Sequence, residues 1–322
     1  MVAATLTVEN HLPADFIART LRQDVATGLT ADPKWLPPRW FYDDRGSELF
    51  DEITRLPEYY PTRAERQILT ARAAEIAEVS AATALVELGA GACEKTHLLL
   101  DALRAAGSLR TYVPVDVSDG ALRTASANLL WDYPGLAVHA VVADFDRHLG
   151  LLPVDGHRMV ALLGGTIGNL DPARFLADVR ATLRPGETLL LGTDLVKSPD
   201  VLVPAYDDAQ GVTAEFNRNV LNVLNAELGA DFETGAFDHV ARWDAEHERI
   251  EMRLRAQHAM RVRIAEVDLT VDLRRGEEIR TEISAKFRRE RVVALLDAAG
   301  FGLTRWWTDD DGLFGLSLAT AR

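Results

Sequence analysis

The stretch of sequence that most constrains the fold covers residues 84–96, ALVELGAGACEKT. A short apolar run carries one acid, Glu87, and breaks into a turn that contains Gly89 and Gly91. An apolar helical pattern follows from Glu94 onward. A strand, a glycine turn and a helix in this order are typical of α/β proteins that bind an adenosine-bearing cofactor at the carboxyl ends of their strands. Because glycine has no Cβ, the backbone of this turn can approach a ligand closely.

The sequence around this turn alternates between strand and helix patterns. A helix at 62–79 comes first, with Thr62 and Glu65 as a capping box. A helix at 290–299 and two strands around a turn at 309–312 end the chain. After the helix at 62–79 and before residue 196, we expect strands at 84–88, 111–117, 137–145, 158–163 and 188–195. Helices at 94–106, 119–131 and 172–183 separate them. Repeated β-α-β units predict a parallel sheet with helices on both faces.

Two other segments lack this alternation. Residues 12–30 have helical spacing, and 33–61 are rich in proline and aromatic residues, with one short helix expected at 47–55. Residues 196–287 indicate helices at 198–208 and 212–228, followed by short antiparallel strands. The stripe expected on the first helix consists of Phe16, Ile17, Leu21 and Val25. We therefore predict an α/β domain of residues 62–196 plus 287–322, and a second α+β domain of residues 1–61 plus 197–286.

The composition favours a small-molecule substrate. The chain has 322 residues, and its 35 Lys and Arg against 49 Asp and Glu give a formal net charge of −14. No run rich in Lys or Arg is present, which argues against nucleic acid as a partner. No signal peptide and no apolar stretch of membrane-spanning length is evident, so we expect no membrane partner. The single cysteine, Cys93, excludes an intramolecular disulfide and suits the cytoplasm; no thiolate-activating motif around it supports a nucleophile.

The residues near the glycine turn favour S-adenosylmethionine (SAM) over a nicotinamide cofactor. Glu94 stands where a nicotinamide-binding fingerprint has its third glycine. Asp116 follows Gly91 by 25 residues and suits the ribose hydroxyls. At the end of the third strand, Asp144 and Phe145 suit the adenine amino group and ring. Together with Glu87, these acids end three successive strands, a pattern typical of SAM enzymes. Each acid alone is also explained as a solvated strand end or a helix cap.

The loop after the fourth strand, GGTIGNL at 164–170, faces the methyl donor in this architecture. The amide carbonyl of Asn169 can accept a hydrogen bond from a substrate amine and so aim the nitrogen lone pair at a methyl group. The alternative is that Asn169 caps the helix that follows, a role that Asp171 fills equally well.

Polar side chains in the second domain are candidates for substrate binding. On a strand, Glu282 and Ser284 share one face, with Ile283 in the core. The pair can bind a polar heterocycle, although a solvated strand face explains the spacing equally well. Tyr42, Tyr59 and Tyr60 are also notable, and the alternative for them is amphipathic packing with the hydroxyl at the surface.

Seven motifs together resemble a known family. They are VELGAGACEKT, PKWLPPRWFYD, LPEYYPTRAE, GTIGNL, LLGTDLVK, AYDDAQGVTAEFNRN and TEISAKF, and with WWTD at 306–309 they span nearly the whole chain. The chain is similar to the histidine Nα-methyltransferases of ergothioneine biosynthesis, which use SAM to trimethylate the α-amino group of L-histidine, giving hercynine. The resemblance implies a class I (Rossmann-like) SAM-dependent methyltransferase domain with a second domain built from the N-terminal segment and an insertion.

The resemblance also implies roles for individual residues. The cofactor would be held by Gly89, Lys95, Asp116, Asp144 and Phe145. Asn169 would orient the amino group, with Tyr42 nearby as one candidate for accepting the amine proton and water as the other. The remaining substrate residues would be Tyr59 and Tyr206 for the carboxylate, Glu282 and Ser284 for the imidazole, and Met252 as a pocket wall. No metal is expected.

One departure and two rival functions accompany the resemblance. Ala92 and Cys93 replace the usual Thr-Ser of the family, which removes hydroxyls near the amino-acid end of the cofactor. The rivals are a class I methyltransferase for another small amine or amino acid, and a non-catalytic SAM-binding regulator. We expect a monomer whose partner is L-histidine.

Overall fold

The computed structural model describes residues 5–90, 95–153 and 155–322, without the side chains of Ala121 and Asp146. Cys93 and its neighbours Gly91, Ala92 and Glu94 therefore lie outside the described residues. The chain divides into two compact units. Unit 1 consists of Met1–Pro13, Pro61–Leu195 and Phe287–Arg322, and unit 2 consists of Ala14–Tyr60 and Val196–Lys286.

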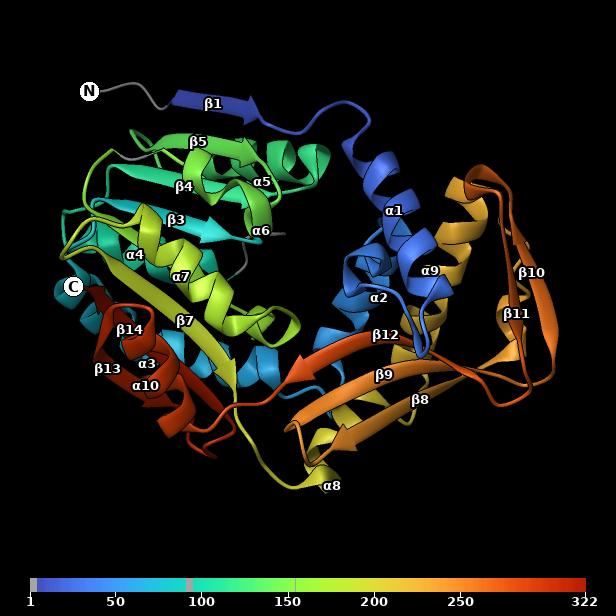
Figure 1. The fold of residues 1–322 in the computed structure, drawn as a ribbon. Coiled ribbons are helices and arrows are strands. Elements are labelled where there is room, and N and C mark those ends of the chain that lie inside the picture. Colours follow the sequence, from blue (N-terminus) through green and yellow to red (C-terminus); the bar gives the residue numbers. More distant parts are fainter. Residues whose placement is uncertain (1–4, 91–94, 154) are drawn as a thin grey trace. The chain divides into compact units, whose positions relative to one another are not determined.

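Unit 1 contains a mixed sheet in the order β1-β5-β4-β3-β6-β7-β14-β13 (Figure 1). The neighbours from β1 to β7 pair in parallel, whereas β14 is antiparallel to both β7 and β13. The strands are β1 (Thr5–Asn10), β3 (Ala84–Leu88), β4 (Thr111–Asp116), β5 (Ala137–Val142), β6 (Arg158–Leu162), β7 (Thr188–Asp194), β13 (Phe301–Thr308) and β14 (Phe314–Ala321). The predicted α/β fold class, including the two C-terminal strands, is confirmed.

The strand order places a topological switch point beside β3. From β3 the chain continues to β4 and β5 on one side, and it then returns to β6 and β7 on the other side. Leu88, the last residue of β3, is paired with Val115 of β4 and Leu162 of β6. In open α/β sheets, ligands bind at the carboxyl ends of the strands on either side of such a reversal. The loops after β3 and β6 are therefore where a ligand is expected in unit 1.

Helices cover both faces of this sheet, so its central strands are buried along their whole length. One hydrophobic core joins Ile68 and Ile76, from the helix before β3, to Leu99 and Leu103 from the helix after it and to Leu85 of β3. Continuous burial explains why the residues of these strands are mainly apolar. The helices are α3 (Pro61–Ser80), α4 (Thr96–Ala105), α5 (Asp119–Asp132), α6 (Phe145–His148), α7 (Pro172–Thr182) and α10 (Arg289–Ala298).

The N-terminal segment corrects the predicted domain boundary. We assigned residues 1–61 to the second domain, but β1 pairs in parallel with β5 from Thr5↔Ala137 to Asn10↔Val142 and so belongs to unit 1. β1 is an edge strand whose residues are exposed or half-buried. Its sequence, TLTVEN, therefore lacks the apolar run of a central strand, and its pairing covers the open edge of β5.

Unit 2 combines helices with two small sheets. α9 packs against β8 and β9 of a sheet with the order β2-β12-β9-β8. Its helices are α1 (Phe16–Thr30), α2 (Asp44–Arg55), α8 (Pro199–Leu202) and α9 (Val212–Leu228), with short 3-10 turns η1 (Pro38–Phe41) and η4 (Pro204–Tyr206). Its strands are β2 (Lys34–Trp35), β8 (Phe237–Asp244), β9 (Arg249–Ala256), β12 (Glu278–Ala285) and the separate pair β10 (Met260–Ile264) and β11 (Leu269–Leu273).

Three local predictions were wrong. The helix expected at 198–208 is broken into α8 and η4, because Pro204 has no N–H to continue the helical ladder. Ile17 is 46% exposed, and the buried stripe of α1 includes Leu29 instead. Glu65 does not belong to a capping box, because its carboxylate is buried and binds the loop after β6.

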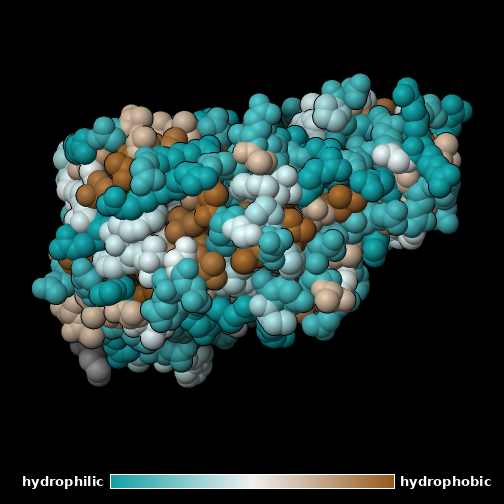
Figure 2. All heavy atoms as spheres, turned by 90° about the horizontal axis from the view of Figure 1, so that it is seen from below, coloured by the Kyte–Doolittle hydropathy of each residue, from teal (hydrophilic) through white to brown (hydrophobic). Residues whose placement is uncertain are grey.

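Hydrophilic residues dominate the face shown in Figure 2. Within the described part of the chain, no helix combines the length and the apolar character needed to cross a membrane.

Candidate active site

Backbone hydrogen bonds tie together the carboxyl ends of three strands in unit 1. Gly89 N–H donates to Val115 O at 2.9 Å, and Ala143 N–H donates to Asp116 O at 2.9 Å. Gly89 has a φ of +71°, which other residues rarely adopt, and a Cβ there would lie 3.7 Å from the Phe145 ring. Gly89, Asp116 and the Asp144–Phe145 pair, predicted separately along the sequence, therefore lie at one edge of the sheet.

Two acids and an aromatic ring at this edge have the chemistry of a nucleoside site. Asp116 is half-buried, and its Oδ1 accepts from Ser118 N–H at 3.0 Å. Asp144 is buried and lies 3.6 Å from the Arg147 Nε. The Phe145 ring is half-buried and meets Phe175 edge-on at 6.2 Å between centroids. Carboxylates that can accept from ribose hydroxyls or an adenine amino group, beside an aromatic face, fit an adenosine-bearing cofactor.

Glu87, the acid at the end of β3, has a different surrounding. It is buried, and its Oε2 accepts from Thr96 Oγ1 at 2.6 Å and from Tyr112 Oη at 2.7 Å. Burial raises the pKa of this carboxyl above its usual value, and the two hydroxyl donors only partly oppose that shift. Glu87 thus joins β3 to α4 and β4 within the protein interior.

The loop after β6 is anchored by Glu65, a residue that sequence reasoning placed wrongly. The carboxylate of Glu65 is fully buried, accepts from Gly164 N–H at 2.8 and 2.9 Å, and forms an ion pair with Lys95. Gly164 and Gly165 both have φ above +70°, a conformation that favours glycine. The sequence sign of this role was the position of Glu65, an acid beside Ala64 on the otherwise apolar, buried face of α3.

Asn169 lies in the 3-10 turn η3 (Thr166–Asn169), directly before α7. The cap of α7 is Asp171, whose Oδ1 accepts from the backbone N–H groups of Ala173 at 3.1 Å and Arg174 at 3.3 Å. The alternative in which Asn169 caps this helix is therefore excluded.

In unit 2, the strands β9 and β12 bring Met252 and Glu282 together. The two residues are directly opposite each other in the antiparallel pair, so their side chains share one face. Glu282 is half-buried and Met252 is buried. Ile283 points to the opposite face and is only half-buried, which corrects its predicted place in the core.

Tyr206 and Ser284 are joined directly, although 78 residues separate them. Tyr206 Oη lies 2.9 Å from Ser284 Oγ, and both side chains are buried. Lys286, which is fully buried, donates from Nζ to Tyr206 Oη at 2.7 Å and to Ser284 Oγ at 2.8 Å. Sequence reasoning missed Lys286, although the period of two along β12, continued one residue past its end at Ala285, places it on the face of Glu282 and Ser284.

The backbone of Tyr206 is held by a buried histidine. His239 Nε2 lies 2.8 Å from Tyr206 O, and its Nδ1 lies 2.8 Å from Asn217 Nδ2. Burial lowers the pKa of His239, so the ring is neutral at physiological pH. Because the Asn217 amide N–H₂ donates to Nδ1, the ring proton is on Nε2 and is donated to Tyr206 O.

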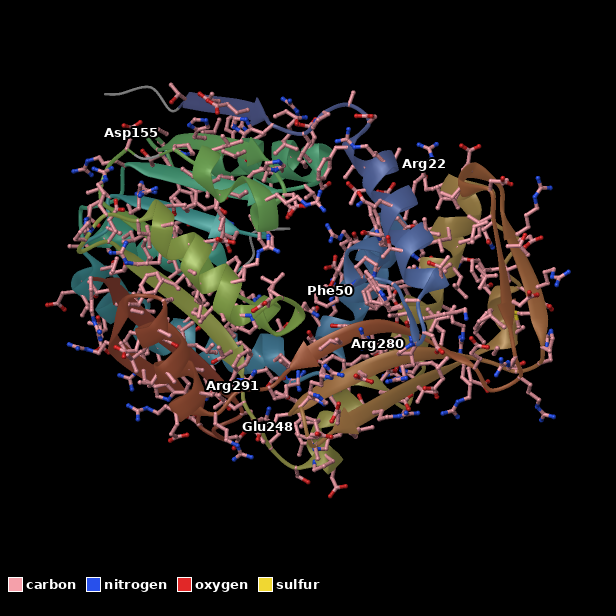
Figure 3. All side chains as sticks on the ribbon, in the orientation of Figure 1. Arg22, Phe50, Asp155, Glu248, Arg280 and Arg291 are labelled. Atoms are coloured by element: carbon pink, nitrogen blue, oxygen red, sulfur yellow. The ribbon has the colours of Figure 1, made fainter. Side chains whose placement is uncertain are left out.

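Tyr42 and Tyr59 belong to one aromatic cluster around Phe50, which is labelled on α2 in Figure 3. Phe50 meets Tyr42 edge-on at 5.6 Å and Tyr59 at 6.1 Å between ring centroids, and Phe216 of α9 completes the cluster at 5.5 Å from Tyr42. Packing thus accounts for the rings, as the alternative for these tyrosines expected.

Tyr42 has a perturbed hydroxyl. Burial within the surrounding protein raises the pKa of Tyr42 above its usual range, and the negative charge of Glu282 adds to the effect. Since the residue is 52% exposed, the shift reflects dense surroundings rather than complete exclusion of water. Tyr42 is therefore a neutral phenol at physiological pH.

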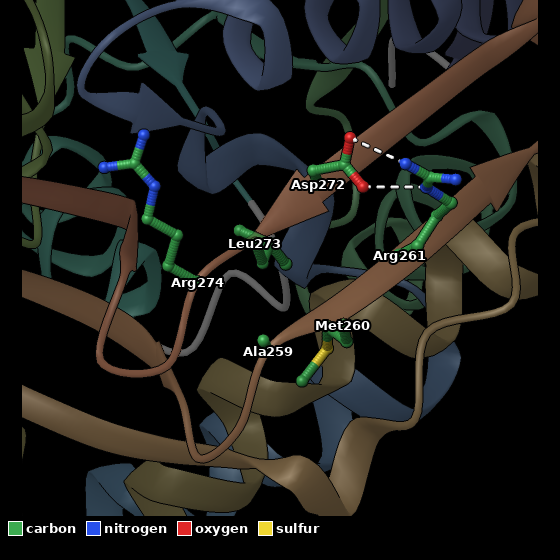
Figure 4. Close-up of a pocket in the computed structure, with 6 residues that line it drawn as sticks. All are labelled: Ala259, Met260, Arg261, Asp272, Leu273 and Arg274. Atoms are coloured by element: carbon green, nitrogen blue, oxygen red, sulfur yellow. Dashed lines mark hydrogen bonds and ion pairs between the residues drawn. The ribbon is translucent and has the colours of Figure 1, made fainter.

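An open depression elsewhere in unit 2 does not contain these residues. It lies over β10 and β11 and includes the exposed ion pair between Arg261 Nε and Asp272 Oδ1 at 2.8 Å (Figure 4). No predicted site residue lines it. Across the described ranges, no group of three or more His, Cys, Asp and Glu is placed to hold a metal ion.

Comparison with known proteins agrees with the resemblance in the sequence. The model of a family described as "Histidine-specific methyltransferase, SAM-dependent" matches residues 21–321. The chain is 58% identical to a protein of Mycolicibacterium smegmatis named "Histidine N-alpha-methyltransferase", covering 98% of this chain and 99% of that protein. The protein of the same name from Mycobacterium tuberculosis is 56% identical, with 98% and 99% covered. A Neurospora crassa protein named "Ergothioneine biosynthesis protein 1" is 31% identical over 86% of this chain and 32% of its own length.

Proposed function

Because the chain belongs to the family of histidine-specific, SAM-dependent methyltransferases, we propose that it methylates the α-amino nitrogen of L-histidine with SAM as the methyl donor. The product is hercynine, the trimethylated amino acid, and the reaction is the first step of ergothioneine biosynthesis. The observation that carries the proposal is the 58% identity, over 98% of this chain, to a protein that bears this name.

We assign the cofactor to the edge of the sheet in unit 1. SAM supplies a methyl group on a sulfonium, which is already activated for transfer to a nucleophile. Asp116 accepts from the ribose hydroxyls. Asp144 accepts from the adenine amino group, and Phe145 packs against the adenine ring. Gly89 lets the backbone come close to the cofactor. Lys95, which forms an ion pair with Glu65, also holds the cofactor. The protein contributes mainly orientation and exclusion of water, because the methyl group needs no further activation.

We assign the amino acid to the polar residues of unit 2. Glu282 accepts from an imidazole N–H, Ser284 binds the other ring nitrogen, and Met252, opposite Glu282, forms a wall beside them. Tyr59 and Tyr206 bind the carboxylate. A substrate without the imidazole N–H offers no donor to the half-buried Glu282 carboxylate, which gives strong selection against other side chains.

The reacting nitrogen must be neutral when it attacks. Asn169 orients it, because the side-chain carbonyl accepts from the amine N–H and so aims the lone pair. Tyr42 is a neutral phenol, and a neutral phenol is a poor base. We therefore propose that Tyr42 hydrogen-bonds near the amine and that water accepts the proton before each transfer.

The proposal is tested with purified protein incubated with SAM and one amino acid at a time, with products followed by mass spectrometry. We expect methylated forms of L-histidine up to the trimethylated product. Turnover of another amine without methylated histidine would assign the enzyme to a different substrate, and binding of SAM without any turnover would favour the regulator. Light scattering of the same sample tests the proposed monomer.

A further inference from the structure

The buried ammonium of Lys286 contacts two of the residues assigned to the substrate. Its Nζ donates to Tyr206 Oη at 2.7 Å and to Ser284 Oγ at 2.8 Å, and it also lies 4.6 Å from the centre of the Tyr206 ring. The side chain has no exposed surface. We infer that Lys286 is a positioning residue that orients the Tyr206 and Ser284 hydroxyls toward acceptor groups of the amino-acid substrate. This inference rests on the proposed function.

The hydrogen bonds between Lys286 and the two hydroxyls have a fixed direction. A lysine ammonium has three N–H donors and no acceptor, so both hydroxyl oxygens accept from Lys286. Tyr206 and Ser284 also share a hydrogen bond of 2.9 Å, which uses one of their two hydroxyl protons. The other proton can be donated to a third group, and both protons can be donated outward when a substrate with two acceptors replaces the hydrogen bond between the hydroxyls. Because both hydroxyl oxygens accept from Lys286, the hydroxyl pair binds other groups by donating a proton to them.

The substrate offers two acceptors of this kind. When Ser284 donates to Tyr206, the Tyr206 O–H can donate to the substrate carboxylate. When Tyr206 donates to Ser284, the Ser284 O–H can donate to the unprotonated ring nitrogen of an imidazole, while Glu282 takes the N–H. Lys286 stabilises both arrangements, because a hydrogen bond from a charged donor holds its acceptor more firmly than one from a neutral donor.

The position of Lys286 is itself well defined. It follows Ser284 by two residues, directly after the end of β12 at Ala285, and its backbone N–H donates to Glu248 O at 2.7 Å. Tyr206 is held at its other end, where its carbonyl oxygen accepts from His239 Nε2 at 2.8 Å. Tyr206 is thus held at its hydroxyl by a buried cation and at its backbone by a buried imidazole, which is the arrangement expected of a preorganised binding group.

The test measures binding of L-histidine and of SAM by calorimetry in Lys286→Met, which removes the charge and all three donors. We expect L-histidine binding to weaken by about ten- to a hundredfold, as for the loss of one hydrogen bond to a charged group. SAM binding should stay within about twofold, since the cofactor is assigned to unit 1. Lys34→Met is the matched control, because Lys34 pairs with Glu277 at 2.6 Å and contacts neither hydroxyl, and it should change neither affinity.

A double-mutant cycle separates positioning from general stabilisation. If Lys286 acts through the hydroxyl, the penalties of Lys286→Met and Tyr206→Phe on L-histidine binding should combine to less than their product. Multiplicative penalties, or unchanged L-histidine binding in a cooperatively unfolding Lys286→Met protein, would overturn the inference. Where Lys286→Met does not unfold cooperatively, Lys286→Gln takes its place with the same expectation. If neither variant does, Lys286 serves folding and the inference fails.

Failure of the proposed function gives a different result. A wild-type protein that binds SAM but not L-histidine would refute the function before any variant is made. A wild-type protein that methylates L-histidine, with Lys286 variants that bind it equally well, would refute only the role of Lys286.

Discussion

Replacing Glu65 by glutamine tests whether one buried carboxylate anchors the loop that carries Asn169. Both partners of Glu65, the Gly164 N–H and the Lys95 ammonium, are donors. A glutamine keeps the shape but has a single oxygen, so its N–H₂ must face one of these donors. The substitution therefore removes a hydrogen bond and leaves two donors opposed to each other.

The expected cost follows from burial. Loss of a hydrogen bond to a charged group costs about 1.5–3 kcal/mol. Lys95 keeps 21% of its side chain exposed and recovers some hydration, whereas the Glu65 side chain has no exposed surface. We therefore expect the free energy of unfolding to fall by about 2 kcal/mol. We also expect turnover to fall, because the loop that holds Asn169 loses its anchor.

Urea unfolding followed by circular dichroism measures the change, with kinetics on the same samples. Glu78→Gln is the matched control, because Glu78 is exposed on the same helix, and it should change stability by less than about 0.5 kcal/mol. Equal unfolding midpoints and equal turnover for Glu65→Gln and wild type would refute the anchoring role.

Three further predictions concern binding, acid stability and the pH profile. Glu282→Ala should weaken L-histidine binding and leave SAM binding nearly unchanged in calorimetry; equal losses for both ligands would contradict its assigned role. Burial alone would raise the pKa of Glu187, but its buried ion pair with Arg158 at 2.7 Å lowers that pKa below 4.5. The stabilising effect of this ion pair should therefore be complete above pH about 4.5 and disappear as the pH falls through the lower folded-state pKa of Glu187. Glu187→Gln lacks the carboxylate, so its stability should not show this loss. Tyr42→Phe should keep the ascending limb of the kcat/KM pH profile, and loss of that limb would identify Tyr42 as the base.

The central strands were predictable because helices cover both of their faces. Full burial requires continuous apolar runs, and glycine or proline marks their ends, so β3, β6 and β7 could be located from sequence. β1 escaped prediction because an edge strand is partly polar. The unpredicted β8 alternates only weakly, since most of its residues are half-buried.

The candidate site shows the same division between local and long-range information. The acids at strand ends and the face shared by Glu282 and Ser284 follow from local periodicity. The contacts of Glu65 with Gly164, and of Lys286 with Tyr206, join residues 99 and 80 positions apart. Charged residues at buried positions were the only local sign of such contacts, and their partners depend on the tertiary fold.

The identity of the substrate is tested most directly by competition. The protein is incubated with SAM and an equimolar mixture of the common amino acids, and the methylated products are quantified together by mass spectrometry. In such a mixture the products form in proportion to kcat/KM, so differences in concentration or enzyme activity cancel. We predict that methylated histidine, ending in hercynine, accounts for nearly all transferred methyl groups. A mixture in which another amino acid receives most of them would contradict the proposed function.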